Sequence, residues 1–210
     1  MNKLIIVGAG RFGRFSRYLA TSCNLEVVGF LDDTMKVETT IDGLPILGST
    51  EKMVQFSQTH QCKIAICISN MPARIKLVKE CETSNIELAT LIHSTVIQHP
   101  GSTIGKGVII QPYTVIQTGA IIGNNTLIEE HCSIGVDTIV GKNSVIAPHV
   151  VITGAAKIEE NCFIGSNSTI NPEIIVKSGC VIGSGSVVIR NTESHCVYAG
   201  SPVKKIRQII

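Results

Sequence analysis

A six-residue repeat in the second half of the chain restricts its fold more than any other feature of the 210 residues. Counting every sixth residue from Ile104 to Val188 gives fifteen positions, and each of them is Ile or Val. Ile92 keeps the same phase, and Gln98 is the position between Ile92 and Ile104 that breaks it. The column consists of Ile104, Ile110, Ile116, Ile122, Ile128, Ile134, Val140, Ile146, Ile152, Ile158, Ile164, Ile170, Val176, Ile182 and Val188.

A second column lies two residues before the first, and its members are small or β-branched apart from Ile174. They are Ser102, Val108, Thr114, Ala120, Thr126, Cys132, Thr138, Ser144, Val150, Ala156, Cys162, Ser168, Ile174, Cys180 and Ser186. Period six is neither the period of about 3.6 of an α-helix nor the period of about 2 of a plain strand. Two inward side chains separated by one outward side chain make a short strand, and the remaining three residues turn a corner. Three such units close a coil of about 18 residues, so the repeat predicts about five coils of a hexapeptide β-helix.

The composition agrees with stacked β structure and narrows the partners. There is no Trp, with three Tyr and five Phe, so the core has to be built from small aliphatic contacts. The formal charge is +2 without a basic run, so we expect neither a nucleic acid nor a membrane surface as partner. The eight cysteines are irregularly spaced and form no C-x-x-C motif. We interpret them as reduced, buried thiols rather than disulfides, and we expect no metal.

Two further features bear on localisation. No apolar stretch reaches the roughly 18 residues that cross a bilayer. The N-terminus, MNKLIIVGAGRFGR, runs straight into a strand and lacks the long apolar region and the cleavage site of a signal peptide. We therefore expect a cytoplasmic protein.

The first ninety residues read as a different fold class, an α/β half-Rossmann domain. Buried strands are predicted at 3–7, 25–31 and 63–69, a short strand near 87–93, helices over 14–23 and near 72–84, and a loop at 41–49. We expect residues 1–90 to form a Rossmann-like domain that binds a nucleotide-sugar, and residues 91–210 to form the β-helix with a C-terminal tail.

A glycine-rich turn opens this first domain. Gly8, Gly10 and Gly13 have G-x-G-x-x-G spacing after the first strand, and Asp32 follows the second strand. Such glycines let the backbone approach a phosphate at a helix N-terminus, and the acid can bind a ribose hydroxyl. About ninety residues make only half of a dinucleotide domain, so we favour one nucleotide or nucleotide-sugar over NAD or FAD. The third interpretation is a turn that serves packing alone.

Several motifs together resemble one family of bacterial sugar acyltransferases, which includes the sialic-acid O-acetyltransferases and the UDP-4-amino-sugar N-acetyltransferases. The resemblance covers essentially the whole chain and includes the uninterrupted hexads. Its other marks are GAGRFG (8–13), FLDD (30–33), ISN (68–70), LIHSTV (91–96) and AGSPVKKI (199–206). It implies a left-handed parallel β-helix, a homotrimer with active sites in the grooves between subunits, and acetyl-CoA as co-substrate.

The resemblance also implies site residues. The candidates for binding the nucleotide-linked sugar are Gly8, Gly10, Gly13, Asp32, Asp33, Ser69 and Asn70. The candidates for binding acetyl-CoA are Gly154, Ser166, Ser184 and Pro202.

The chain departs from the family at the catalytic base. Members carry a histidine followed by an acid, and the histidine takes a proton from the attacking amine or hydroxyl group. Matching the hexads places this pair in GVDTIVG (135–141), where Asp137 holds the position of the acid and Val136 that of the histidine. Valine cannot accept a proton.

Two other histidines are candidates for a relocated base. His131 and His149 are 18 residues apart, so we expect them to stack at one corner of consecutive coils, with Tyr113 one coil below. Glu130 precedes His131 and is near enough to orient it. The alternative is a column of stacked surface or interface histidines. We expect His93 to be structural at the domain junction and His60 to lie in a solvated loop.

The sequence therefore favours an acetyl-CoA-dependent acyltransferase that acetylates a nucleotide-linked sugar in bacterial surface-glycan biosynthesis, with N-acylation of an amino sugar ahead of O-acylation. Val136 keeps open a non-catalytic trimer that binds the same ligands. A weaker alternative, from the glycine motif alone, is an NAD-linked oxidoreductase.

Overall fold

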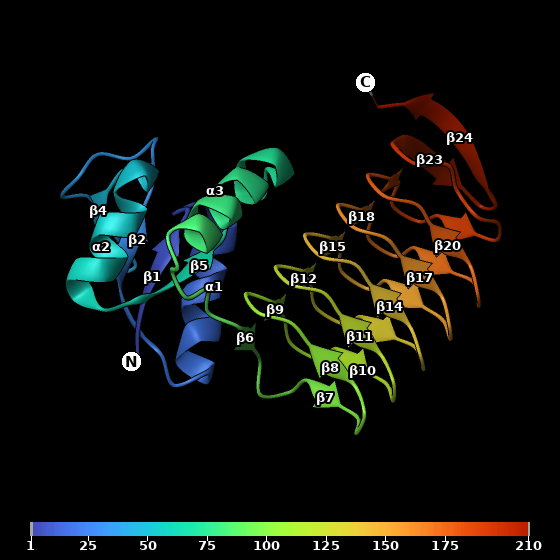
Figure 1. Ribbon diagram of the computed structural model, residues 1–210, viewed down its shortest axis with the longest axis horizontal. Coiled ribbons are helices and arrows are strands. Elements are labelled where there is room, and N and C mark those ends of the chain that lie inside the picture. Colours follow the sequence, from blue (N-terminus) through green and yellow to red (C-terminus); the bar gives the residue numbers. More distant parts are fainter. Residues whose placement is uncertain (1, 210) are drawn as a thin grey trace. The chain divides into compact units, whose positions relative to one another are not determined.

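The computed structural model describes residues 2–209 (Figure 1). The chain divides into two compact units, one ending at Leu91 and the other beginning at Ile92. Each unit has its own architecture and is described by itself.

The first unit is an α/β domain built on a five-stranded sheet of order β3-β4-β2-β1-β5. Its strands are β1 (Lys3–Val7), β2 (Glu26–Leu31), β3 (Thr40–Ile41), β4 (Leu44–Gly48) and β5 (Lys63–Ile66). Its helices are α1 (Arg11–Ser22), α2 (Met53–His60) and α3 (Met71–Thr83), with a 3-10 turn η1 (Thr50–Lys52). Strands β4, β2, β1 and β5 run parallel. This is the half-Rossmann arrangement expected from the sequence.

Both faces of this sheet are covered, which explains why β1 reads as an unbroken apolar run. Leu4 to Val7 are each fully buried. Ile5 and Val7 pack with side chains of α2 and α3 such as Met53 and Leu77. On the other face, Gly13 of α1 lies against Ile6, because a Cβ built on Gly13 would be 3.5 Å from Ile6 Cγ2.

Some local expectations for this domain are wrong. The loop expected at 41–49 is an antiparallel hairpin of β3 and β4, whose turn Asp42-Gly43 has φ of +50° and +81°. An Asp-Gly pair is a strong hairpin signal because both central residues of such a turn need positive φ. His60 is the last residue of α2 rather than part of a loop, although it is exposed. The short strand expected near 87–93 is present in part, as a bridge between Leu88 and Ile64 and as the two-residue strand β6 (Leu91–Ile92).

The second unit is a parallel β-helix, as the repeat predicts, and it is left-handed, as the resemblance implies. Each hexad supplies one two-residue strand, and strands 18 residues apart pair in parallel, as Ile128 of β12 does with Ile146 of β15. One sheet holds β7 (Ile97–Gln98), β10 (Val115–Ile116), β13 (Ser133–Ile134), β16 (Val151–Ile152), β19 (Thr169–Ile170) and β22 (Val187–Val188). The second holds β8 (Thr103–Ile104), β11 (Ile121–Ile122), β14 (Ile139–Val140), β17 (Lys157–Ile158) and β20 (Ile175–Val176). The third holds β6 (Leu91–Ile92), β9 (Ile109–Ile110), β12 (Leu127–Ile128), β15 (Val145–Ile146), β18 (Phe163–Ile164), β21 (Val181–Ile182), β23 (Cys196–Gly200) and β24 (Val203–Gln208).

The two sequence columns form the interior of the coil. Ile134 and Ile152 of the aliphatic column are fully buried, as are Thr114 and Ser144 of the small column. Five hydroxyls of the small column also donate a hydrogen bond to the carbonyl 15 residues later, as Thr114 does to Glu129 at 3.0 Å. They belong to Thr114, Thr126, Thr138, Ser144 and Ser168. Cys132 does the same with its thiol, 3.1 Å from the carbonyl of Ala147. A thiol therefore fits this column for the same reason as Ser or Thr.

The coil turns at three corners, each marked by a residue with positive φ. The first corner consists of Tyr113, His131, His149, Asn167 and Gly185. The second consists of Gly119, Asp137, Ala155 and Glu173, and the third of Gly107, Asn125, Asn143, Asn161 and Gly179. The backbone N–H of each corner residue from Asn125 to Gly185 donates to the coil below, as His131 does to the carbonyl of Pro112 at 3.1 Å. These hydrogen bonds keep the corners of successive coils in register.

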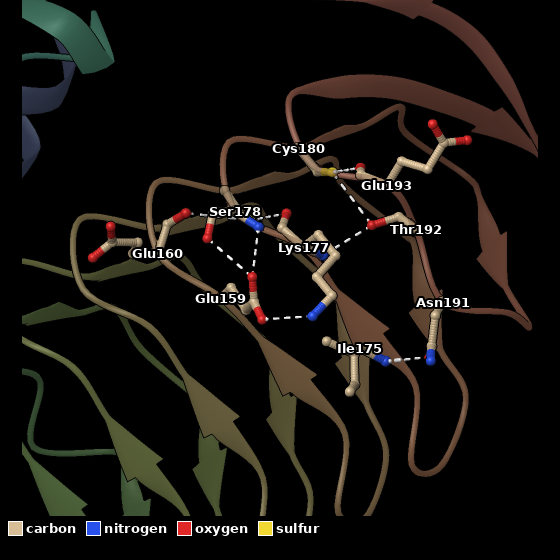
Figure 2. Close-up of polar contacts among 10 residues, drawn as sticks. Glu159, Glu160, Ile175, Lys177, Ser178, Cys180, Asn191, Thr192 and Glu193 are labelled. Atoms are coloured by element: carbon tan, nitrogen blue, oxygen red, sulfur yellow. Dashed lines mark hydrogen bonds and ion pairs between the residues drawn. The ribbon is translucent and has the colours of Figure 1, made fainter.

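The loop after β22 closes the free edge of β20 with side chains (Figure 2). The amide oxygen of Asn191 accepts from the backbone N–H of Ile175 at 2.8 Å, and the hydroxyl of Thr192 accepts from that of Lys177 at 2.9 Å. In the same region, Glu159 accepts from Lys177 Nζ at 3.1 Å. An open strand edge would leave these N–H groups unpaired, so the loop takes the place of a further coil.

Candidate functional site

A cavity of about 350 Å³ lies in the first unit at the carboxyl ends of β1, β2 and β5. Its lining residues are Gly8, Gly10, Arg11, Phe12, Asp32, Cys67, Ile68 and Ser69. The chain runs from β1 to β2 on one side of β1 and later returns to β5 on the other side of β1. The direction of the strand order therefore switches at β1, and in parallel α/β sheets ligands bind at such a switch point.

The three glycines have different tasks at this cavity. Gly8 has φ of +100°, and a Cβ there would be 2.7 Å from the carbonyl oxygen of Cys67. A Cβ on Gly13 would overlap the carbonyl oxygen of Gly8, so Gly13 lets α1 approach the turn closely. Gly10 is the N-cap of α1, and a Cβ there would meet open space. The structure thus assigns close packing to Gly8 and Gly13 and an open approach to Gly10.

The N-terminus of α1 faces this cavity without a capping side chain or an acidic residue in its first turn. The first N–H groups of a helix have no partners within the helix, and they carry the positive end of its dipole. An anion in the cavity would therefore be stabilised.

Asp32 ties the end of β2 to the glycine turn. Its Oδ2 accepts from the backbone N–H of Ala9 at 2.8 Å. Its Oδ1 accepts from the backbone N–H of Thr34 at 2.8 Å and from the Thr34 hydroxyl at 2.7 Å. Burial on its own would raise the pKa of Asp32, but the hydrogen bonds from Thr34 and Ala9 outweigh it and hold the pKa below its ordinary value. Asp32 is therefore a carboxylate at neutral pH.

The other expected acceptor-site residues lie close by with different partners. Ser69 is exposed and lines the cavity. Both carboxylate oxygens of Asp33 accept from Thr50, at 2.7 Å from its backbone N–H and 2.9 Å from its hydroxyl. Asn70 caps α3 by accepting from the backbone N–H of Ala73 at 2.9 Å. Asp33 and Asn70 thus hold the loops beside the cavity.

A second group of candidates lies on the first corner of the β-helix. The ring of His131 stacks on Tyr113 at a centroid distance of 5.0 Å and on His149 at 4.9 Å, with the two imidazoles 7° from parallel. Tyr113 is 60% exposed, and both histidines are exposed. The stacked arrangement expected from the spacing of 18 is therefore present, and its edge is open to a ligand.

Two acidic residues, Glu129 and Glu130, directly precede His131 in the chain. The carbonyl of Glu130 accepts from the backbone N–H of His149 at 3.0 Å. Burial raises the pKa of the neighbouring Glu129, and the charge of Glu130 raises it further. The sequence places both Glu129 and Glu130 before His131 as acids that could orient it, but it does not show how far Glu129 is buried.

Val136 and Asp137 lie at a different corner of the β-helix. Asp137 is at the second corner, where its carboxylate lies against Gly119, and Val136 beside it is 44% exposed. His131 is at the first corner of the same coil. Within one chain the structure therefore does not bring His131 and Asp137 together.

The residues expected at acetyl-CoA lie on two edges and on the C-terminal hairpin. Ser166 belongs to the first corner, because its carbonyl accepts from the N–H of Gly185 there, and Ser184 precedes Gly185. Gly154 belongs to the second corner and accepts from the N–H of Glu173 at 3.1 Å. Pro202 lies in the turn between β23 and β24. Ser166 and Ser184 thus continue the edge that carries His131 and His149.

Within residues 2–209, no group of three or more His, Cys, Asp or Glu side chains could hold a metal ion. The same residues include no helix that is long and apolar enough to cross a membrane.

The sequence matches known families in both units. Residues 3–81 match the model of the PglD N-terminal domain. Segments 101–136, 119–154 and 155–190 match the model of the bacterial transferase hexapeptide, which describes six repeats. These matches confirm the resemblance seen in the motifs at the level of the two domains. None of the curated protein sequences matches the chain significantly.

Solved structures confirm the fold over its full length. The acetyltransferase domain of PglB from Neisseria gonorrhoeae FA1090 matches with a TM-score of 0.92 and 24% identity, over 98% of this chain and 100% of that chain. A variant of perosamine N-acetyltransferase from Caulobacter crescentus, in complex with CoA and GDP-perosamine, matches with a TM-score of 0.93 and 19% identity, over 99% and 98%. WeeI from Acinetobacter baumannii AYE matches with a TM-score of 0.88 and 23% identity, over 97% and 99%.

Proposed function

Starting from a chain that combines a PglD N-terminal domain with bacterial transferase hexapeptide repeats, we propose that the protein transfers the acetyl group of acetyl-CoA to a nucleotide-linked sugar. We favour an amino sugar as acceptor, N-acylation as the reaction, and bacterial surface-glycan biosynthesis in the cytoplasm as its setting. The observation that carries the proposal is the cavity at the switch point, faced by the uncapped N-terminus of α1. The perosamine N-acetyltransferase bound to CoA and GDP-perosamine has the same fold, which supports this ligand pair.

The acceptor nucleotide would bind in this cavity. The open approach at Gly10 admits a phosphate to the first N–H groups of α1, and Ser69 provides a hydroxyl in the lining of the cavity. Asp32 keeps the glycine turn in shape and presents a carboxylate to a ribose hydroxyl. In this proposal Asp33 and Asn70 act indirectly, because their side chains already hold neighbouring loops.

Acetyl-CoA would lie along the β-helix in a groove between copies of a homotrimer, contacting Gly154, Ser166, Ser184 and Pro202. Exposed apolar side chains on the faces of the β-helix support such an assembly. They are Ile97, Ile121, Ile139, Val151 and Phe163, which are between 36% and 54% exposed.

The chemistry requires one proton acceptor. The amine nitrogen attacks the thioester carbonyl carbon, the tetrahedral intermediate collapses, and the carbon–sulfur bond breaks to release CoA as a thiolate. The nitrogen loses a proton on the way, and the thiolate takes one up. We propose His131 as the acceptor, oriented by Glu130 and by the stacked His149, because Val136 cannot serve. General-base catalysis contributes roughly 10²–10⁴-fold to such reactions, and the remainder comes from positioning the two substrates.

A second candidate is a non-catalytic trimer that binds the same ligands. Val136, at the position of the family histidine, is the observation that favours it. The oxidoreductase alternative has less support, since the sheet of the first unit has four parallel strands and so resembles one half of a dinucleotide domain.

A thiol-release assay tests the proposal. The protein is mixed with acetyl-CoA and a panel of UDP-, GDP- and dTDP-linked amino sugars, and free CoA is followed over time. Acceptor-dependent release supports the transferase. Calorimetric binding of CoA and of a nucleotide-sugar without release supports the non-catalytic alternative.

A further inference from the structure

A buried arginine on α3 has no acidic partner. Arg74 is 4% exposed, and its Nε and Nη1 are buried without a hydrogen-bond acceptor. None of the ion pairs formed within residues 2–209 includes it. Buried charges in proteins are normally paired, because an isolated charge loses its hydration without compensation. An arginine in this position therefore needs an explanation.

Arg74 belongs to a helix that begins beside the wall of the cavity. It is in the first turns of α3, which begins two residues after Ser69, and Cys67 and Ser69 line the cavity. Burial raises the pKa of the Cys67 thiol to about 11, and a hydrogen bond with Ser16 and the positive charge of Arg74 act in the opposite direction. The charge of Arg74 therefore acts on Cys67, which is one of the residues that line the cavity.

The group stays charged although it is buried. Burial lowers the pKa of the Arg74 guanidinium to about 10, which leaves it protonated at neutral pH. A second positive element at the cavity is the uncapped N-terminus of α1, and Arg11 adds a further charge to the lining. Asp32 is the acidic residue in the lining, and its oxygens are engaged by Ala9 and Thr34. The cavity thus has an excess of positive charge.

We propose that Arg74 is the buried counter-charge for the diphosphate of a nucleotide bound in this cavity. The unpaired guanidinium and the N-terminus of α1 would both attract the anion. This inference rests on the proposed function and identifies the part of the acceptor that the first unit recognises. It also explains why a cation is retained in a place where an apolar side chain of similar size would be easier to bury.

The expected effect follows from Coulomb's law. Two opposite unit charges about 10 Å apart, at an effective dielectric constant of about 20, attract strongly enough to change a dissociation constant about tenfold. Because the charge acts from within the protein, salt should screen it less than it screens a surface lysine.

The test compares Arg74→Met, Arg74→Lys and, as control, Lys79→Met, which removes an exposed charge from the same helix. Binding of UDP, GDP and dTDP and of inorganic pyrophosphate is measured by calorimetry, and each melting temperature is recorded. We expect Arg74→Met to bind the diphosphates about tenfold more weakly. We expect Arg74→Lys and Lys79→Met to stay close to wild type, and the affinity for the parent nucleoside to be unchanged throughout.

Equal diphosphate affinity of wild type and Arg74→Met would overturn the inference. An equal loss for nucleoside and diphosphate would also overturn it, because Arg74 would then only shape the fold. If wild type releases CoA with a nucleotide-linked amino sugar while Arg74→Met keeps its diphosphate affinity, the inference fails and the proposed function stands. If wild type binds neither a nucleoside diphosphate nor pyrophosphate, both fail.

Discussion

Replacing Asp32 by Asn tests how the nucleotide cavity is held in shape. The carboxylate accepts three hydrogen bonds, from the Ala9 N–H, the Thr34 N–H and the Thr34 hydroxyl. An amide of the same shape has one oxygen, so at least one backbone N–H would face an NH₂ group instead of an acceptor. Leaving one such donor unpaired costs about 1–3 kcal/mol when it is buried. Asp32 is partly exposed, so we expect a value near 1 kcal/mol.

The assay is urea unfolding of wild type and Asp32→Asn, read at several pH values. The pKa of Asp32 is lowered in the folded state, so its contribution is fully present above the ordinary value of about 3.9 and is lost as pH falls through the lowered pKa. The two proteins should therefore differ at pH 7 and converge in acid. The control is Asp42→Asn, whose carboxylate pairs with exposed Arg14 and should change stability little. Equal stability of Asp32→Asn and wild type at pH 7 would refute the reasoning.

Three other substitutions test separate parts of the account. His131→Ala should lower kcat/KM at least tenfold. The exposed His60→Ala is its control, and an unchanged kcat/KM would eliminate His131 as base. Gly13→Ala should push α1 away from Gly8 and abolish nucleotide binding in calorimetry, and unaltered binding would contradict the close approach. Thr192→Val should leave the Lys177 N–H unpaired and destabilise the β-helix by about 1–3 kcal/mol in urea unfolding, and no change would contradict the edge closure.

The β-helix could be predicted from the sequence because the same six-residue repeat runs from Ile104 to Val188. Ile134 and the other members of its column all face one core, so fifteen independent positions report the same geometry. The thiol–carbonyl hydrogen bond of Cys132 was not predicted, because the sequence distinguishes a small residue from a large one but does not show the carbonyl that the thiol meets. The corner of His131 and His149 was predicted, since residues 18 apart stack whenever the coil is unbroken.

The candidate site was less accessible to prediction than the fold. The G-x-G-x-x-G spacing located the turn, yet the different tasks of Gly10 and Gly13 depend on what a Cβ would meet. Asp32 and Asp33 are adjacent in sequence, so the sequence does not distinguish their roles. Their hydrogen-bond partners do, because Asp32 binds the glycine turn at Ala9 and Asp33 binds Thr50 in a neighbouring loop. Nothing in the sequence singled out Arg74 as a candidate site residue, because its burial and its lack of a partner result from the packing of α3.

We propose that this chain transfers an acetyl group although Val136 stands where the resemblance places the catalytic histidine. The most direct measurement is mass spectrometry of the acceptor after incubation with isotopically labelled acetyl-CoA and the panel of nucleotide-linked amino sugars. The account predicts that one acceptor gains a labelled acetyl group with wild type and gains it at least tenfold more slowly with His131→Ala. An acceptor that binds in calorimetry but stays unlabelled would contradict the account and show that the fold retains its ligands without the chemistry.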